Sequence, residues 1–187
     1  MLRVLNISQG TSVDGPGLRT SIYFAGCHHQ CPGCHNPESW SFEGGEERTV
    51  EEIMEVVRYN RFPVTFSGGD PLYIAKDLIP LAREIRMFFN AHPEYIKPSP
   101  QGESRRGASE ASDVLWIYSG FRYEDVKDRD GVRELFEYAD VLVDGPYVDA
   151  LNPHSVSGGS KGAPLRFRGS SNQRFIDLRT GKSFELD

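Results

Sequence analysis

Cysteine is scarce in this chain, with three residues among 187. An odd number of cysteines cannot pair completely in disulfides, which argues against a disulfide-stabilised secreted protein. The first residues, Met1–Asn6, also lack the long apolar region of a signal peptide. We therefore expect a protein of the reducing cytoplasm, where clustered thiols bind metal or carry out redox chemistry.

Long apolar runs and an excess of positive charge are missing as well. No run approaches the ~20 apolar residues that a membrane-spanning helix needs, so we expect no membrane association. Lys and Arg total 21 against 27 Asp and Glu, which gives a net charge of −6. Because phosphate binding needs a basic face, we also expect no nucleic-acid partner.

Length and composition predict one domain over residues 1–187. An apolar content of 38% and a charged content of 26% are typical of a globular protein with one sizeable core. Two stretches, 91–112 and 149–164, show no hydrophobic period. We interpret both as irregular insertions, because structureless loops longer than ~12–15 residues are usually functional or disordered.

Short apolar runs predict the strands. They are nearly continuous and rich in β-branched and aromatic residues, as in a parallel sheet covered on both faces. The main runs are Ser21–Ala25, Val64–Phe66, Leu115–Tyr118 and Val141–Val143. Two further short strands are predicted at Leu165–Phe167 and Phe175–Leu178, with a turn at Thr180–Lys182.

Helical spacing separates these runs. Apolar residues recur at the intervals of one helix face in segments that begin at Val50, Leu78 and Val132. Thr49 and Glu52 form a capping-box pattern before the first of them. The alternation implies right-handed βαβ units, too few to close an eight-stranded barrel of ~250 residues. We predict the α/β class, as a partial (open) parallel β/α barrel, with a doubly wound sheet as the alternative.

Unusual residues follow each of the main predicted strands. Since chemistry in parallel α/β folds collects at the carboxyl ends of strands, we expect these loops to surround one active site. The loops are Gly26-Cys27, Ser67–Pro71, Ser119-Gly120 and Asp144–Pro146.

The cysteines form a C-x3-C-x2-C pattern of Cys27, Cys31 and Cys34. Iron–sulfur clusters are normally held by four cysteines, so three would leave one iron open for chemistry. Three alternatives remain at this point: a zinc site with His35 as fourth ligand, a redox dithiol of Cys31 and Cys34, and unrelated buried cysteines. The spacing favours the iron–sulfur cluster.

The Ser67–Asp70 loop allows two interpretations. Gly68 and Gly69 let the backbone approach a ligand closely, and the Asp70 carboxylate can accept from an ammonium group. A tight turn with Asp70 as the cap of a following helix explains the same residues. Beside a cysteine loop on the same edge of the sheet, ligand binding is the better explanation.

The cysteine motif with the glycine-rich loop resembles the radical S-adenosylmethionine enzymes. Further segments resemble one group of them, the activating proteins of anaerobic (class III) ribonucleotide reductases. These segments are Asp14–Arg19, Cys31–Pro37, Ser67–Leu72, Val143–Tyr147 and Arg168–Gln173. The resemblance spreads from residue 14 to residue 173 in the order of that family.

The resemblance implies a function. Cys27, Cys31 and Cys34 would bind three irons of a [4Fe–4S] cluster, and S-adenosyl-L-methionine would chelate the open iron. Ser67, Gly68, Gly69 and Asp70 would hold the methionine ammonium group. At neighbouring strand ends, Ser119 and Asp144 are expected to contact the cofactor. No acid–base residue is expected, because the cofactors carry the difficult chemistry.

The implied reaction is glycyl-radical activation. Reductive cleavage of S-adenosylmethionine would yield a radical that removes a hydrogen from a glycine of the large reductase subunit, a glycyl radical protein. A flavodoxin or ferredoxin would donate the electron. The alternatives are a radical S-adenosylmethionine enzyme acting on a small purine-like metabolite, and a zinc-stabilised binding module without turnover.

Overall fold

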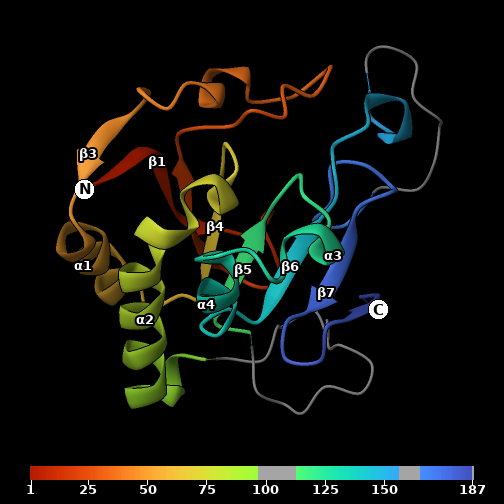
Figure 1. Ribbon diagram of the computed structural model, residues 1–187. Coiled ribbons are helices and arrows are strands. Elements are labelled where there is room, and N and C mark those ends of the chain that lie inside the picture. The colour runs from red at the N-terminus through yellow and green to blue at the C-terminus, as the bar shows by residue number, and fades with distance from the viewer. Residues whose placement is uncertain (97–112, 156–164, 187) are drawn as a thin grey trace.

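The computed structural model describes residues 1–96, 113–155 and 165–186, and its strands form one open sheet (Figure 1). The sheet order is β3-β1-β2-β4-β5-β6-β7-β8. The strands are β1 Leu2–Thr11, β2 Arg19–Phe24, β3 Glu46–Arg48, β4 Val64–Gly68, β5 Leu115–Tyr118, β6 Val141–Asp144, β7 Arg174–Asp177 and β8 Lys182–Phe184. The predicted α/β class with an open sheet is confirmed.

The centre of the sheet is parallel and its margins are antiparallel. Strands β2, β4, β5 and β6 pair in parallel. On one side β1 runs antiparallel to both β2 and β3, and on the other β7 runs antiparallel to both β6 and β8. The arrangement fits a partial barrel, because the two outermost strands, β3 and β8, do not pair with each other.

Helices cover one face of this sheet. The α-helices are α1 Val50–Asn60, α2 Ala75–Ala91, α3 Tyr123–Val126 and α4 Val132–Phe136, and the 3-10 turns are η1 Pro37–Trp40, η2 Pro71–Ile74, η3 Pro93–Tyr95 and η4 Asp149–Leu151. Figure 1 shows α1 and α2 side by side along one flank of the sheet. The predicted capping box is confirmed, since Thr49 Oγ1 accepts from Glu52 N and the Glu52 carboxylate accepts from Thr49 N.

Alternation along the strands divides their side chains between two faces. Ile22 and Phe24 of β2 lie in the main core, where β4, β5 and β6 pack with the helices. The opposite face carries a smaller cluster, which contains Trp116, Val141, Val143 and Phe175. The burial of both faces explains why the parallel strands have nearly continuous apolar sequences.

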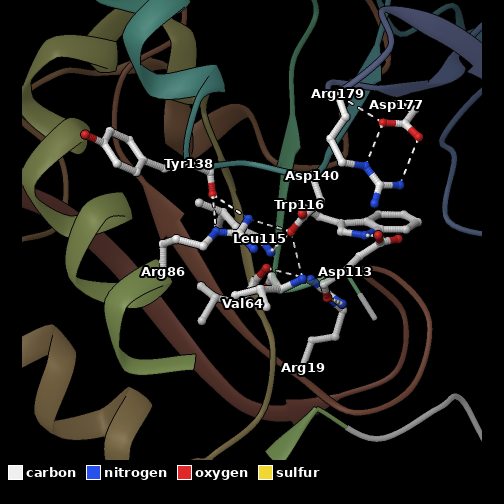
Figure 2. A network of polar contacts seen from close by, with 11 residues as sticks. Arg19, Val64, Arg86, Asp113, Leu115, Trp116, Tyr138, Asp140, Asp177 and Arg179 are labelled. Carbon is white, nitrogen blue, oxygen red and sulfur yellow. Dashed lines mark hydrogen bonds and ion pairs between the residues drawn. The ribbon is translucent and has the colours of Figure 1, made fainter. Parts of the chain in front are cut away.

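Polar residues tie together the amino ends of β4 and β5 (Figure 2). The Asp140 carboxylate accepts from Val114 N, Leu115 N and the Arg86 guanidinium of α2, at 2.8, 2.9 and 2.7 Å. Arg19, 2% exposed, donates to Val64 O at 2.7 Å and lies against the Trp116 ring. We call the group of Arg19, Arg86 and Asp140 the base network.

Some predicted elements differ from those observed. The strand predicted at Leu165–Phe167 is wrong, because Phe167 has a left-handed backbone with φ of 54°. Of the two predicted insertions, 97–112 and 156–164 lie outside the described residues. Residues 91–96 of the first insertion include the end of α2 and the turn η3, and residues 149–155 of the second insertion include the turn η4.

Every helix in the described part of the chain falls short of the length and apolarity that crossing a membrane would require.

Candidate active site

The loops after the four parallel strands lie at one edge of the sheet, as the sequence predicts. Phe24 at the end of β2 pairs with Gly68 at the end of β4, and Tyr118 at the end of β5 pairs with Val143 of β6. We call this edge, with its following loops, the rim. The rim is opposite the base network, because the base network lies at the amino ends of the same strands.

The cysteine loop, residues 25–36, leaves β2 and is held by backbone hydrogen bonds. Gly26 N donates to Ser39 O at 2.8 Å, and Cys27 N donates to Trp40 O at 3.1 Å. Gly26 has φ of 104°, and a side chain there would collide with the Phe42 ring at 2.3 Å. A residue with a Cβ therefore could not replace Gly26 without moving the loop.

All three cysteines are free thiols. Cys27 is buried, whereas Cys31 and Cys34 are half-buried. Burial raises the pKa of the Cys27 and Cys31 thiols, and hydrogen bonds from backbone N–H groups oppose that rise. The groups that lower the pKa in this way are the N–H groups of His29 and Gln30 for Cys27, and those of Tyr147 and of Cys31 itself for Cys31.

The chemistry of this donor set fits an iron–sulfur cluster. Three cysteines on one loop supply sulfur ligands of the kind that hold known clusters. Within the described residues, no three His, Cys, Asp or Glu side chains gather as ligands for a single metal ion.

Gly68 and Gly69 bring β4 against the cysteine loop. Gly68 has φ of 106°, and a Cβ on it would lie 2.4 Å from the Phe24 backbone. A Cβ on Gly69 would lie 2.4 Å from Gly26 O. Gly69 N and Asp70 N donate to Phe24 O and Gly26 O at 2.8 and 2.9 Å. The glycines thus serve a close approach of two backbones, and their role toward a cofactor stays a prediction.

Asp70 is the centre of a hydrogen-bond hub that joins three loops of the rim. The residue is 2% exposed. Its Oδ1 accepts from Leu72 N at 2.9 Å, which is the predicted cap of the turn η2. Its Oδ2 accepts from Ser119 Oγ and Gly120 N, both at 2.9 Å, and lies 2.8 Å from His29 Nε2.

Two predicted site residues, Ser119 and Ser67, lie at the same strand ends as Asp70. Ser119 belongs to the hub, and Ser67 lies on β4. Ser119 is 6% exposed and its hydroxyl is directed at the Asp70 carboxylate. Ser67 is half-buried on β4 and pairs with Tyr23 of β2. The structure therefore brings Ser67, Asp70 and Ser119 together at adjacent strand ends. Contact of these residues with a cofactor stays a prediction.

Asp144 has a different environment from the other predicted site residues. It is fully buried at the end of β6, where its carboxylate pairs with Arg174 at 2.5 Å and accepts from Tyr123 N at 2.8 Å. Arg174 also pairs with Glu124 at 2.8 Å. These contacts join β6 to β7 and to the start of α3, and they occupy both Asp144 oxygens.

Aromatic rings pack beside the cysteine loop. Tyr73 of η2 lies 5.1 Å from the His28 ring and 5.0 Å from the Phe121 ring, measured between centroids. His29 contacts the same Phe121 ring at 4.5 Å. His28 is exposed at its edge of the group and His29 is half-buried. The packing supports the cysteine loop against the β4 and β5 loops.

Two contributors to the rim could not be assigned from sequence patterns. His29 was distinguished only by its place beside the cysteines, and its bond to Asp70 crosses 41 residues of chain. The Tyr147 backbone N–H lowers the pKa of the Cys31 thiol, and every residue type except proline carries that group. No sequence signal could therefore have identified Tyr147.

Comparison with known families agrees with this geometry. Residues 13–96 and 104–176 match the family described as a 4Fe-4S single cluster domain. The match covers most of the chain, which therefore belongs to this family of radical S-adenosylmethionine-type domains.

Particular relatives are named anaerobic ribonucleoside-triphosphate reductase-activating protein. The Salmonella typhi protein is 28% identical over 173 residues, covering 89% of this chain and 93% of its own. The Escherichia coli K12 protein is 27% identical over 174 residues, with the same coverage. The protein of Enterobacteria phage T4 is 28% identical over 166 residues, covering 87% of this chain and 85% of its own.

Proposed function

We propose that this protein is a glycyl-radical activase for the large subunit of an anaerobic ribonucleotide reductase. The observation that carries the proposal is the rim itself: three free thiols on the β2 loop beside the buried Asp70 hub, in a chain of the 4Fe-4S single cluster family. The names of the relatives support the choice of partner. We further propose that residues 1–187 act as one domain.

The chain's own residues would bind and position the cofactors. Cys27, Cys31 and Cys34 would hold three irons of a [4Fe–4S] cluster, and Ser67–Asp70 would hold the methionine part of S-adenosylmethionine. When bound, these groups supply the one-electron cleavage chemistry and the hydrogen abstraction. The protein keeps the site ordered and excludes water.

Asp70 would position the two cofactors, the cluster and S-adenosylmethionine, relative to each other. Its carboxylate already joins His29 of the cysteine loop to Ser119 and Gly120 of the β5 loop. An ammonium group near this carboxylate would be stabilised by its charge and by its low exposure. Ser119 would then orient the Asp70 carboxylate, and we retain Asp144 as a weaker candidate for cofactor contact.

Anaerobic reconstitution and a radical assay test the proposal. The reconstituted protein should contain about four irons and four sulfides per chain. With reductant, S-adenosylmethionine and the large reductase subunit, it should produce 5′-deoxyadenosine and a glycyl radical seen by electron paramagnetic resonance. A flavodoxin or ferredoxin should replace the chemical reductant.

Two results would contradict this function in different ways. Cleavage of S-adenosylmethionine without a radical on the reductase subunit would indicate an enzyme acting on a small purine-like metabolite. One tetrahedral zinc per chain, without sulfide, would indicate a zinc-stabilised binding module.

A further inference from the structure

His29 belongs to the cysteine loop, but its side chain contacts residues far from that loop in the sequence. Its Nε2 lies 2.8 Å from Asp70 Oδ2. Since carboxylate oxygens accept hydrogen bonds, the hydrogen of this contact lies on Nε2. The His29 side chain is 18% exposed and that of Asp70 is 1% exposed. A largely shielded bond therefore joins the loop of the thiols to the Ser67–Asp70 loop.

Two aromatic rings restrain the His29 imidazole. The Phe121 ring lies 4.5 Å away between centroids, at an interplanar angle of 67°, and the Tyr73 ring lies 5.4 Å away at 56°. Phe121 follows β5, and Tyr73 belongs to η2, which follows β4. The imidazole thus lies between the segments after two adjacent strands, and these contacts limit its freedom to turn away from Asp70.

Gly120 leaves the space that the imidazole fills. A Cβ on Gly120 would lie 2.6 Å from His29 Cδ2 and 2.8 Å from His29 Nε2. Gly120 does not have a positive φ, so its backbone conformation does not itself require glycine. The place of a glycine at this position is explained instead by the close approach of the His29 ring.

Asp70 holds the cysteine loop at two places. Its backbone N–H donates to Gly26 O at 2.9 Å, which ties down the start of the loop. Its carboxylate binds His29, which lies three residues further along and two residues before Cys31. Two contacts fix the orientation of the loop relative to Ser67–Asp70, which the backbone contact alone would not do.

The Asp70 carboxylate does not depend on His29 to be satisfied. Its Oδ2 also accepts from Ser119 Oγ and Gly120 N, both at 2.9 Å, and its Oδ1 accepts from Leu72 N at 2.9 Å. Loss of the His29 donor would therefore leave both carboxylate oxygens hydrogen-bonded. Such a loss should free the cysteine loop without unfolding the rest of the rim.

We propose that His29 is a positioning residue for S-adenosylmethionine binding, which acts by holding the cysteine loop in a fixed orientation against Asp70. The inference rests on the proposed function, which assigns the cluster to the cysteine loop and the methionine group to Ser67–Asp70. A ligand that contacts both loops at once binds more tightly when the loops are already in place, because less ordering remains to occur on binding.

Equilibrium binding of S-adenosylmethionine to the reconstituted full chain tests the inference, without the reductase subunit. His29→Gln places an amide nitrogen near the position of Nε2 and keeps the donor, whereas His29→Asn is one methylene shorter and cannot reach Asp70. His29→Asn should weaken binding about fivefold, the factor that one net hydrogen bond is worth, and His29→Gln should stay within about twofold of wild type.

Gly120→Ala disturbs the same contact from the other side. Its methyl group would displace the imidazole and keep the Gly120 N–H, so binding should weaken by about the same factor as in His29→Asn. His28→Asn is the control, because His28 is exposed on the same loop, and it should match wild type. All of these proteins should hold about four irons per chain. If His29→Asn does not fold, Gly120→Ala decides the question in its place.

Unchanged affinity in His29→Asn and Gly120→Ala would overturn the inference. Equal weakening in His29→Gln and His29→Asn would do so too, because the hydrogen-bond donor would then have no effect, and so would loss of iron from His29→Asn. In each case radical formation by wild type would leave the proposed function intact. A wild-type protein that binds no cluster would instead overturn the proposed function, and this inference with it.

Discussion

The rim and the base network stand at opposite ends of the same four parallel strands, and both bury polar groups. At the base, Asp140 accepts from two backbone N–H groups and from Arg86. At the rim, Asp70 accepts from Leu72 N, Gly120 N and Ser119. The two carboxylates thus use similar contacts.

The difference lies in what surrounds each carboxylate. The base network connects strands, α2 and backbone carbonyls, and its groups satisfy one another inside the fold. At the rim, the loop that carries three free thiols meets the carboxylate through His29. One end of the sheet therefore stabilises the strands, whereas the other keeps reactive groups available, as is usual for parallel α/β folds. Substitutions at the two ends should have separable effects.

The largest effect on chemistry is expected for Cys31→Ala at the rim. Removing one of three ligands should abolish cluster binding and all cleavage of S-adenosylmethionine. The stability of the apoprotein should change by less than ~1 kcal/mol, since Cys31 is half-buried. Iron analysis and urea unfolding measure the two effects. His28→Ala, at an exposed position on the same loop, should keep its iron, and a cluster in Cys31→Ala would contradict the ligand assignment.

The largest effect on stability is expected for Asp140→Ala at the base. The change leaves Arg86 and two buried N–H groups without their acceptor, and should lower the free energy of unfolding by ~3–5 kcal/mol. Iron content should stay at the wild-type level below the unfolding temperature. Glu134→Ala is the control, because it removes only an exposed ion pair with Arg83 and should cost less than ~1 kcal/mol. An Asp140→Ala protein that is as stable as wild type but binds no iron would contradict the assignment of stability to the base and of chemistry to the rim.

Asp70→Ala should combine the two kinds of effect. The loss of a charged acceptor at the rim should weaken S-adenosylmethionine binding by at least about tenfold, and the unpaired hub donors should cost ~2 kcal/mol of stability. Equilibrium binding to the cluster-loaded protein and urea unfolding provide the measurements. Ser119→Ala, which removes one donor to Asp70, should change both quantities less. Unaltered affinity in Asp70→Ala would exclude a direct role in binding the cofactor.

The smallest effect concerns Tyr118, the last residue of β5. Its hydroxyl donates to Phe167 O at 2.9 Å. Burial, with a contribution from Asp14, raises the pKa of the Tyr118 phenol well above its usual value. The native state therefore keeps the phenol protonated while the unfolded chain releases its proton above about pH 10.

The stability contributed by Tyr118 should be fully present below about pH 10 and decline above it, by ~1.4 kcal/mol at about pH 11. In Tyr118→Phe, the decline due to this phenol should be absent when urea unfolding is measured below about pH 10 and at about pH 11. Tyr59→Phe, at an exposed position, should retain the wild-type decline. An equal decline in Tyr118→Phe and wild type would show that this phenol is not linked to stability.

Local patterns in the sequence were sufficient to predict much of the fold. The β5 and β6 runs are apolar on both faces because both faces are covered, and the Thr49–Glu52 capping box involves residues three apart. The rim could be predicted too, since parallel strands bring their carboxyl ends to one edge. The strand predicted at Leu165–Phe167 is wrong because the Phe167 ring packs against Trp116 from a left-handed backbone and not from an extended one.

The amino-acid sequence is enough to reveal the thiol spacing, the alternation of strand and helix, and the strand ends at which chemistry could occur. These features depend on neighbours a few residues apart, whose geometry follows from the backbone. Folding of the whole chain was needed to show that Asp70 faces His29 and Ser119, and that Asp144 pairs with Arg174. Such contacts join distant parts of the chain, and the packing of the whole sheet determines which groups meet.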